Sequence, residues 1–132
     1  MNGVFVDTSA FYAVLDRDDA NHARARAAWE RLLRGETLLT HNYVLVETAA
    51  LLQYRLGLPA WRAFSTEILP LLQVEWVTEA RHRAALEAVL AASRRKLSLV
   101  DCVSFQAMRD CGLNRAFCFD AHFHEQGFKV VP

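Results

Sequence analysis

The sequence lacks any apolar run that approaches the roughly 20 residues a transmembrane helix needs. Its first residues also lack the basic start and extended apolar segment of a secretory signal peptide. We therefore expect a protein that has no membrane attachment and works in the cytoplasm.

Cysteine is scarce. Cys102, Cys111 and Cys118 each lie in an apolar segment. Their odd number argues against a disulfide framework, and their spacing does not match that of a zinc site. We interpret them as buried thiols of a protein in a reducing compartment, which agrees with a cytoplasmic location.

Neither sign of charge is in excess, because 15 basic side chains balance 15 acidic ones. A neutral chain has no global field that would draw it to nucleic acid or to a membrane surface. A nucleic-acid interface would have to be built from a local group of basic residues.

What is present is a large apolar fraction, 53% of 132 residues, in a chain of one-domain length, which we place at residues 1–132. Short apolar runs predict strands at Val4–Val6, Leu38–Thr40, Val74–Val77, Ala116–Phe119 and Lys129–Val131. The segments between them predict helices at Ala10–Leu15, Ala20–Arg34, Tyr43–Leu56, Pro59–Pro70, Glu79–Ala92, Leu99–Cys111 and Asp120–Gln126. This alternation is typical of an α/β fold with a central, short parallel β-sheet flanked by helices on both faces.

Polar side chains set several of the predicted helix boundaries. Four of them are placed to cap a helix: Asp19, Asn42, Thr78 and Ser98. In the helix that follows Thr78, three residues are expected to face the core: Leu86, Val89 and Leu90.

Two acidic residues stand directly after predicted strands. Asp7 ends the run Val4–Val6, and Asp120 ends the run Ala116–Phe119. The carboxyl ends of parallel strands meet at one edge of a sheet, where ligands bind in open α/β folds. The alternative for Asp7 is that it only caps the next helix.

Two further acids fall on helix faces that otherwise look apolar. Glu47 shares a face with Val44 and Leu51, so we expect that face to be buried. Asp101 lies in the first turn of its helix, on an apolar face. The alternatives are a distant arginine partner for Glu47 and, for Asp101, a capping box with Ser98.

Carboxylates that converge repel one another unless a cation lies between them. Ligands that are all oxygen suit Mg²⁺ or Mn²⁺. Such a cation can turn a bound water into a nucleophile and stabilise charge on a phosphate. The four acids therefore indicate metal-dependent phosphodiester hydrolysis. Without metal, we expect the cluster to retain protons, with a raised pKa.

The chain resembles the PIN-domain ribonucleases, and among them the VapC-type toxins of bacterial toxin–antitoxin pairs. The resemblance covers essentially the whole chain. Four blocks carry it in order, each with one acid: Val4–Ala10, Asn42–Thr48, Leu97–Phe105 and Phe119–Phe123, with Gly127 and Phe128 after the last.

The resemblance implies a single PIN-like domain that cleaves RNA endonucleolytically with Mg²⁺, or with Mn²⁺ as the alternative. It implies that one set of residues holds the metal and is catalytic: Asp7, Glu47, Asp101 and Asp120. It also implies a homodimer and inhibition by a cognate antitoxin protein.

One position departs from the family pattern. Similar proteins often carry Thr or Ser two residues before the fourth acid, where this chain has Cys118. A thiol is a weaker hydrogen-bond partner than a hydroxyl, so Asp120 is the least secured of the four ligands. The departure keeps a second hypothesis open, a non-catalytic PIN-like module that binds RNA or a partner.

Residues close to the acids complete the predicted site. Four neighbours in sequence are expected to support it: Thr8, Ser9, Ser98 and His122. Three basic residues just before the helix of Asp101 are candidates for contacts with RNA phosphates: Arg94, Arg95 and Lys96. The alternative for these three is a solvated loop.

Overall fold

A computed structural model describes residues 3–132 of the chain. Five strands form one sheet in the order β3-β2-β1-β4-β5, and each pair of neighbours is parallel. The strands are β1 (Val4–Val6), β2 (Leu38–His41), β3 (Gln73–Glu75), β4 (Arg115–Phe117) and β5 (Lys129–Val131). The predicted short parallel sheet is confirmed.

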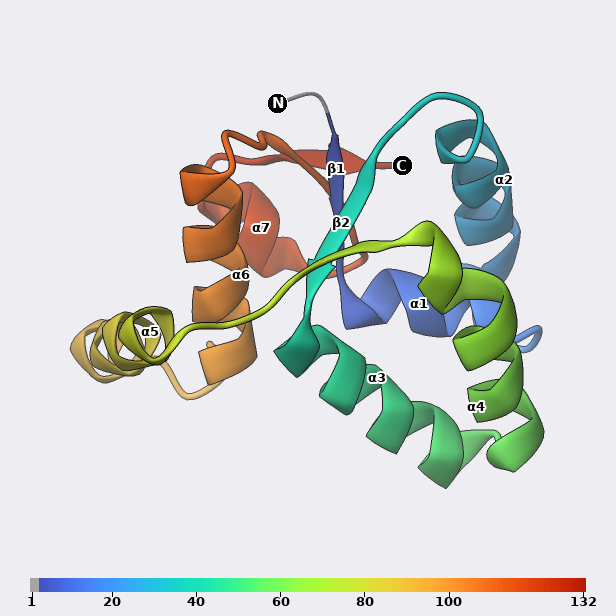
Figure 1. Ribbon diagram of the computed structural model, residues 1–132, viewed down its shortest axis with the longest axis horizontal. Coiled ribbons are helices and arrows are strands. Elements are labelled where there is room, and N and C mark those ends of the chain that lie inside the picture. Colours follow the sequence, from blue (N-terminus) through green and yellow to red (C-terminus); the bar gives the residue numbers. More distant parts are fainter. Residues whose placement is uncertain (1–2) are drawn as a thin grey trace.

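Helices cover both faces of this sheet, as predicted. They are α1 (Thr8–Leu15), α2 (His22–Leu32), α3 (Asn42–Arg55), α4 (Leu58–Ala63), α5 (Glu79–Ala92), α6 (Leu99–Asp110) and α7 (Ala121–Glu125). Figure 1 shows α6 and α7 on one side of the central strands and α1, α2 and α4 on the other. Within residues 3–132, no helix has both the length and the apolar character that a membrane crossing requires.

Aromatic side chains fill the core on each face of the sheet. Phe5 of β1 lies 6.0 Å, between ring centroids, from Phe123 of α7, which lies 5.2 Å from Phe105 of α6. In a second group, Phe11 of α1 lies 5.1 Å from Phe64. All five rings are buried. This packing fixes α1, α6 and α7 relative to the sheet, and these helices begin at the edge where the acids lie.

The helix predicted to begin at Ala20 begins two residues later, at His22. The Asp19 carboxylate accepts a 2.9 Å hydrogen bond from the Asn21 amide and so holds the turn before the helix. Asn21, not Asp19, occupies the cap position. The caps predicted at Thr78 and Ser98 are confirmed.

The cap predicted at Asn42 is also wrong, because β2 continues to His41 and Asn42 is already helical. The Nδ1 atom of His41 accepts a 3.3 Å hydrogen bond from the Val44 amide, and its Nε2 atom lies 2.8 Å from the Ser104 hydroxyl. Burial, with a smaller effect of Arg81, lowers the pKa of His41 to about 3. The ring is therefore neutral, and Nδ1 remains free to accept.

The helix predicted at Pro59–Pro70 changes its winding along its length. After α4, a π-helical turn spans Phe64–Ile68 and a 3₁₀ turn spans Leu69–Leu71. Pro70 has no amide hydrogen to donate, so the last turns of this segment lack one helical hydrogen bond. Within this segment, Phe64 and Ile68 are buried in the core.

The predicted inward face of α5 is largely wrong. Leu86 and Leu90 are 44% and 71% exposed, and Val89 is half-buried. The buried residue of this helix is Ala85. The helix packs mainly against α6 rather than on the sheet, so it turns a small side chain inward and leaves these leucines outside.

Candidate metal centre

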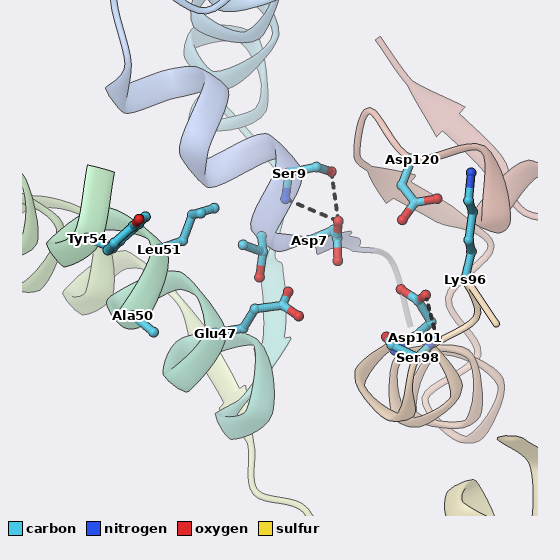
Figure 2. Close-up of a pocket in the computed structure, with 11 residues that line it drawn as sticks. Asp7, Ser9, Glu47, Ala50, Leu51, Tyr54, Lys96, Ser98, Asp101 and Asp120 are labelled. Atoms are coloured by element: carbon cyan, nitrogen blue, oxygen red, sulfur yellow. Dashed lines mark hydrogen bonds between the residues drawn. The ribbon is translucent and has the colours of Figure 1, made fainter. Parts of the chain in front are cut away.

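The four predicted acids line one cavity at the carboxyl edge of the sheet (Figure 2). Asp7 follows β1, Asp120 follows β4, Glu47 comes from α3 and Asp101 from the first turn of α6. The cavity has a volume of about 750 Å³. The convergence expected from a parallel sheet is therefore present in the structure.

Asp7 is both a helix cap and a wall of the cavity. Its Oδ2 atom accepts a 3.1 Å hydrogen bond from the Ser9 amide and a 2.7 Å bond from the Ser9 hydroxyl. Burial raises the pKa of Asp7 to about 7, the bonds from Ser9 oppose this, and the charges of Asp101 and Glu47 add to it. A raised pKa was expected from repulsion between the acids, but burial is the larger cause.

Ser9 joins the two strand ends that carry Asp7 and Asp120. Its hydroxyl donates to Asp7 and accepts a 2.9 Å hydrogen bond from the Phe119 amide, directly before Asp120. Ser9 was predicted to support the site, and in the structure its hydroxyl links the β1–α1 junction to the β4–α7 connection.

Thr8 fixes α3 to the start of α1. Its hydroxyl donates to the Val44 carbonyl at 3.4 Å and accepts from the Thr48 hydroxyl at 3.1 Å. Thr48 directly follows Glu47, and it is fully buried. Thr48 was not predicted from the sequence, although a hydroxyl on the buried face of a helix needs such a partner.

Asp101 forms a capping box with Ser98, which was the alternative prediction for this acid. The Ser98 amide donates to Asp101 Oδ2 at 3.1 Å, and the Asp101 amide donates to the Ser98 hydroxyl at 3.0 Å. A carboxylate has about four acceptor sites, so capping leaves acceptor capacity for a cation. Asp101 is buried except for 8% of its surface, and it lines the cavity.

His122 brings Asp101 and Asp120 together. Its Nδ1 atom lies 3.1 Å from Asp101 Oδ2 and 3.3 Å from Asp120 Oδ1. These three residues offer ligand atoms that all lie within 4.8 Å of one another. The two carboxylates are ligands that suit Mg²⁺ or Mn²⁺. Among the described residues, Asp7 and Glu47 lie outside this close group but line the same cavity.

Glu47 reaches the cavity from an exposed face of α3, not from a buried one as expected. The buried face of α3 consists of Val44, Thr48 and Leu52. Glu47 is exposed and Leu51 is half-buried, and both line the cavity. The pattern of apolar residues predicted the wrong buried face, because α3 carries apolar residues on more than one face.

The Cys118 thiol does not hydrogen-bond to a carboxylate of the site, the role expected of a Thr or Ser hydroxyl at this position. Its Sγ atom lies 3.7 Å from the Asp120 backbone carbonyl, and burial raises the pKa of its thiol to about 12. The thiol is therefore neutral, and Ser9 supplies the hydroxyl that binds a carboxylate. In the described chain, Cys102 and Cys118 are buried free thiols, and Cys111 is half-buried.

The predicted basic residues lie at different distances from the cavity. Lys96 lines it, across from Glu47 (Figure 2). Arg94 instead forms a 2.9 Å ion pair with Glu125, and Arg95 is exposed. Of the three, Lys96 is best placed to contact a ligand in the cavity.

Three further residues of α3 line the cavity: Ala50, Leu51 and Tyr54. Leu51 was expected on the face of Glu47 but not in the site, and the other two were not predicted. The three follow Glu47 by three, four and seven residues, the spacing that places side chains on one face of a helix. That spacing could have identified them once Glu47 was chosen.

Comparison with known proteins agrees with the fold. The PIN domain family profile matches residues 4–129. The chain is 35% identical over 129 residues to the 23S rRNA-specific endonuclease VapC20 of Mycobacterium tuberculosis, and the match covers 97% of each protein.

Solved structures are similar to the chain over 98% of its length. The crystal structure of VapC20, described as a sarcin-ricin loop cleaving toxin, superposes with a TM-score of 0.88 and covers 98% of this chain and 100% of that one. The structure of FitAcB from Neisseria gonorrhoeae has a TM-score of 0.71 at 14% identity, with 98% and 96% coverage, and shows the shared fold.

Proposed function

Because the chain belongs to the PIN-domain family and is a homologue of the VapC toxins, we propose that it is a metal-dependent endoribonuclease and the toxin of a toxin–antitoxin pair. One observation carries the proposal: four carboxylates from separate elements line a single cavity at the carboxyl edge of the sheet. Such a group of oxygen ligands serves to hold a divalent cation.

The residues that would hold Mg²⁺ or Mn²⁺ are Asp7, Glu47, Asp101 and Asp120. The bound cation would supply Lewis acidity to the attacking water and to the phosphate. His122 positions Asp101 and Asp120, since one ring nitrogen contacts both carboxylates.

Ribosomal RNA is the substrate that we propose. The support is the relative named as a 23S rRNA-specific endonuclease, which is similar over nearly the full length of both chains. We further propose a cognate antitoxin as inhibitor, a homodimer as the assembly, and the cytoplasm as the place of action. In this proposal, residues 1–132 form one PIN-like nuclease domain.

The test is an incubation of the protein with ribosomal RNA in Mg²⁺, in Mn²⁺ and in EDTA. We expect discrete fragments with either metal and intact RNA in EDTA. RNA that stays intact with both metals, yet binds the protein, would support the non-catalytic module instead.

Lys96 is expected to contribute one phosphate contact. Because it lines the cavity, Lys96→Ala should reduce the slope of log affinity against log salt by roughly 0.7, the value for one contact with a single strand. Arg94→Ala should have a smaller effect, since Glu125 already engages Arg94. The measurement is binding of a short single-stranded RNA in EDTA over a range of salt.

The control for this experiment is Arg83→Ala, which removes an exposed basic residue that pairs with Glu79 on α5. Its slope should equal that of the wild type. An unchanged slope in Lys96→Ala would mean that Lys96 contacts solvent and not an RNA phosphate.

A further inference from the structure

The face of α3 that carries Glu47 continues into an apolar surface. Ala50, Leu51 and Tyr54 follow Glu47 on this face and line the same cavity; we call these three residues the apolar shelf. Figure 2 shows Leu51 and Tyr54 beside Glu47 on one side of Asp7, with Lys96 and Asp101 on the other. The cavity therefore has an apolar patch on its α3 side, next to Glu47, and charged residues across from it.

Tyr54 has no evident role in the fold. Its side chain is 89% exposed, the largest fraction among the exposed large apolar residues of the described chain. The neighbouring face of α3, with Val44, Thr48 and Leu52, supplies the buried contacts of the helix. An exposed aromatic ring at the wall of a cavity is available to a ligand.

We propose that the apolar shelf stacks one unpaired base of the RNA substrate, next to the phosphate that lies at the acids. The proposal rests on the proposed ribonuclease function and deepens it by identifying a base-binding site. Unpaired RNA bases stack on aromatic side chains, and each base offers a flat apolar face. A nucleotide has the same division into an apolar base and an anionic phosphate that the cavity shows.

The place of the shelf favours a base over a protein segment. Tyr54 stands two helical turns from Glu47, on the same face of α3 and in the same cavity. An apolar protein segment would use the apolar surface alone. A nucleotide would place its base on this surface and its phosphate near Lys96 and the cation that the carboxylates would hold. A volume of about 750 Å³ also lies in the range of sites that hold small molecules.

The experiment compares Tyr54→Ala and Tyr54→Phe with the wild type in binding oligoadenylate of about 12 nucleotides, in EDTA. Tyr54→Ala should weaken binding by about 5-fold to 100-fold, the effect of losing one stacked base, and Tyr54→Phe should bind as the wild type does. An otherwise identical strand with abasic riboses should bind both Tyr54→Ala and the wild type equally weakly. The control is Trp76→Ala, another exposed aromatic residue, which does not line the cavity.

A cleavage arm separates this proposal from the proposed function. With metal and an RNA that the wild type cleaves, Tyr54→Ala should raise KM more than it lowers kcat. Equal affinity of Tyr54→Ala and the wild type for oligoadenylate would contradict base stacking on the apolar shelf, whether or not the protein cleaves RNA. A Tyr54→Ala variant that loses only a protein partner would likewise assign the surface to a protein. Failure of the wild type to cleave any RNA, with the stacking effect intact, would overturn the nuclease function alone.

Discussion

Asp101→Asn is expected to reduce RNA cleavage by at least about 10-fold to 100-fold. Mutation of a residue that hydrogen-bonds to a metal ligand typically costs that much, and loss of a metal ligand itself should cost no less. The substitution separates the two roles of this residue. An asparagine oxygen can still accept the hydrogen bond from the Ser98 amide, so the helix cap is retained. The measurement is the initial rate of cleavage with saturating Mn²⁺, together with a thermal melt.

A matched control is Asp18→Asn, which removes an exposed carboxylate outside the cavity and should leave the rate unchanged. Asp7→Asn and Glu47→Gln should lose activity as Asp101→Asn does. Full activity of Asp101→Asn with saturating metal would mean that the capping box is the whole role of this acid.

The metal-free protein is expected to lose stability as the pH rises from about 4 to about 7. In the folded state, the pKa of Asp7 is raised from 3.8 to about 7, mainly by burial. The folded state therefore binds the proton more tightly than the unfolded state, and this stability is fully present below the unfolded pKa and is lost as pH rises through the folded one. One pKa unit corresponds to about 1.4 kcal/mol, so the loss is on the order of 4 kcal/mol.

A divalent cation should reverse this loss, because it binds the folded state and stabilises it by about 2.7 kcal/mol at a concentration of 100 times Kd. Thermal melts at pH 5 and pH 8, with EDTA and with Mn²⁺, measure both effects. Asp7→Asn should be more stable than the wild type in EDTA at pH 8 and should gain less from Mn²⁺. The difference in pH dependence of the melting temperature between the wild type and Asp7→Asn gives the contribution of Asp7 alone, because other titrating groups are common to both proteins.

Two outcomes would contradict this account of Asp7. One is a wild-type melting temperature that is the same with and without Mn²⁺ at both pH values. The other is a pH dependence that persists unchanged in Asp7→Asn. The control Asp18→Asn should retain both the pH dependence and the response to metal.

The sheet and the acid cavity could be predicted from sequence because both depend on short-range patterns. Strands buried on both faces, such as Val4–Val6, are continuous apolar runs, and an acid directly after such a run lies at the carboxyl edge of the sheet. Parallel order then places Asp7 and Asp120 at the same cavity without any knowledge of the helices between them.

The errors concern contacts between elements that are distant in sequence. His41 caps α3 because its other ring nitrogen meets Ser104 of α6, and no local pattern encodes that partner. The exposed leucines of α5 follow from packing against a helix rather than the sheet. Glu47 was assigned to a buried face because a helix that is apolar on both sides does not show which side is inward.

The hydrogen bond between the Ser9 hydroxyl and the Phe119 amide joins residues 110 positions apart. During synthesis, a chain that has reached the end of α6 already contains Asp7, Glu47 and Asp101, yet it lacks β4, Asp120 and the donor that Ser9 needs. Closing so long a loop is among the slower steps of folding. The complete acid cluster therefore forms only after the chain through Asp120 has left the ribosome, so a shorter nascent chain would lack the fourth acid.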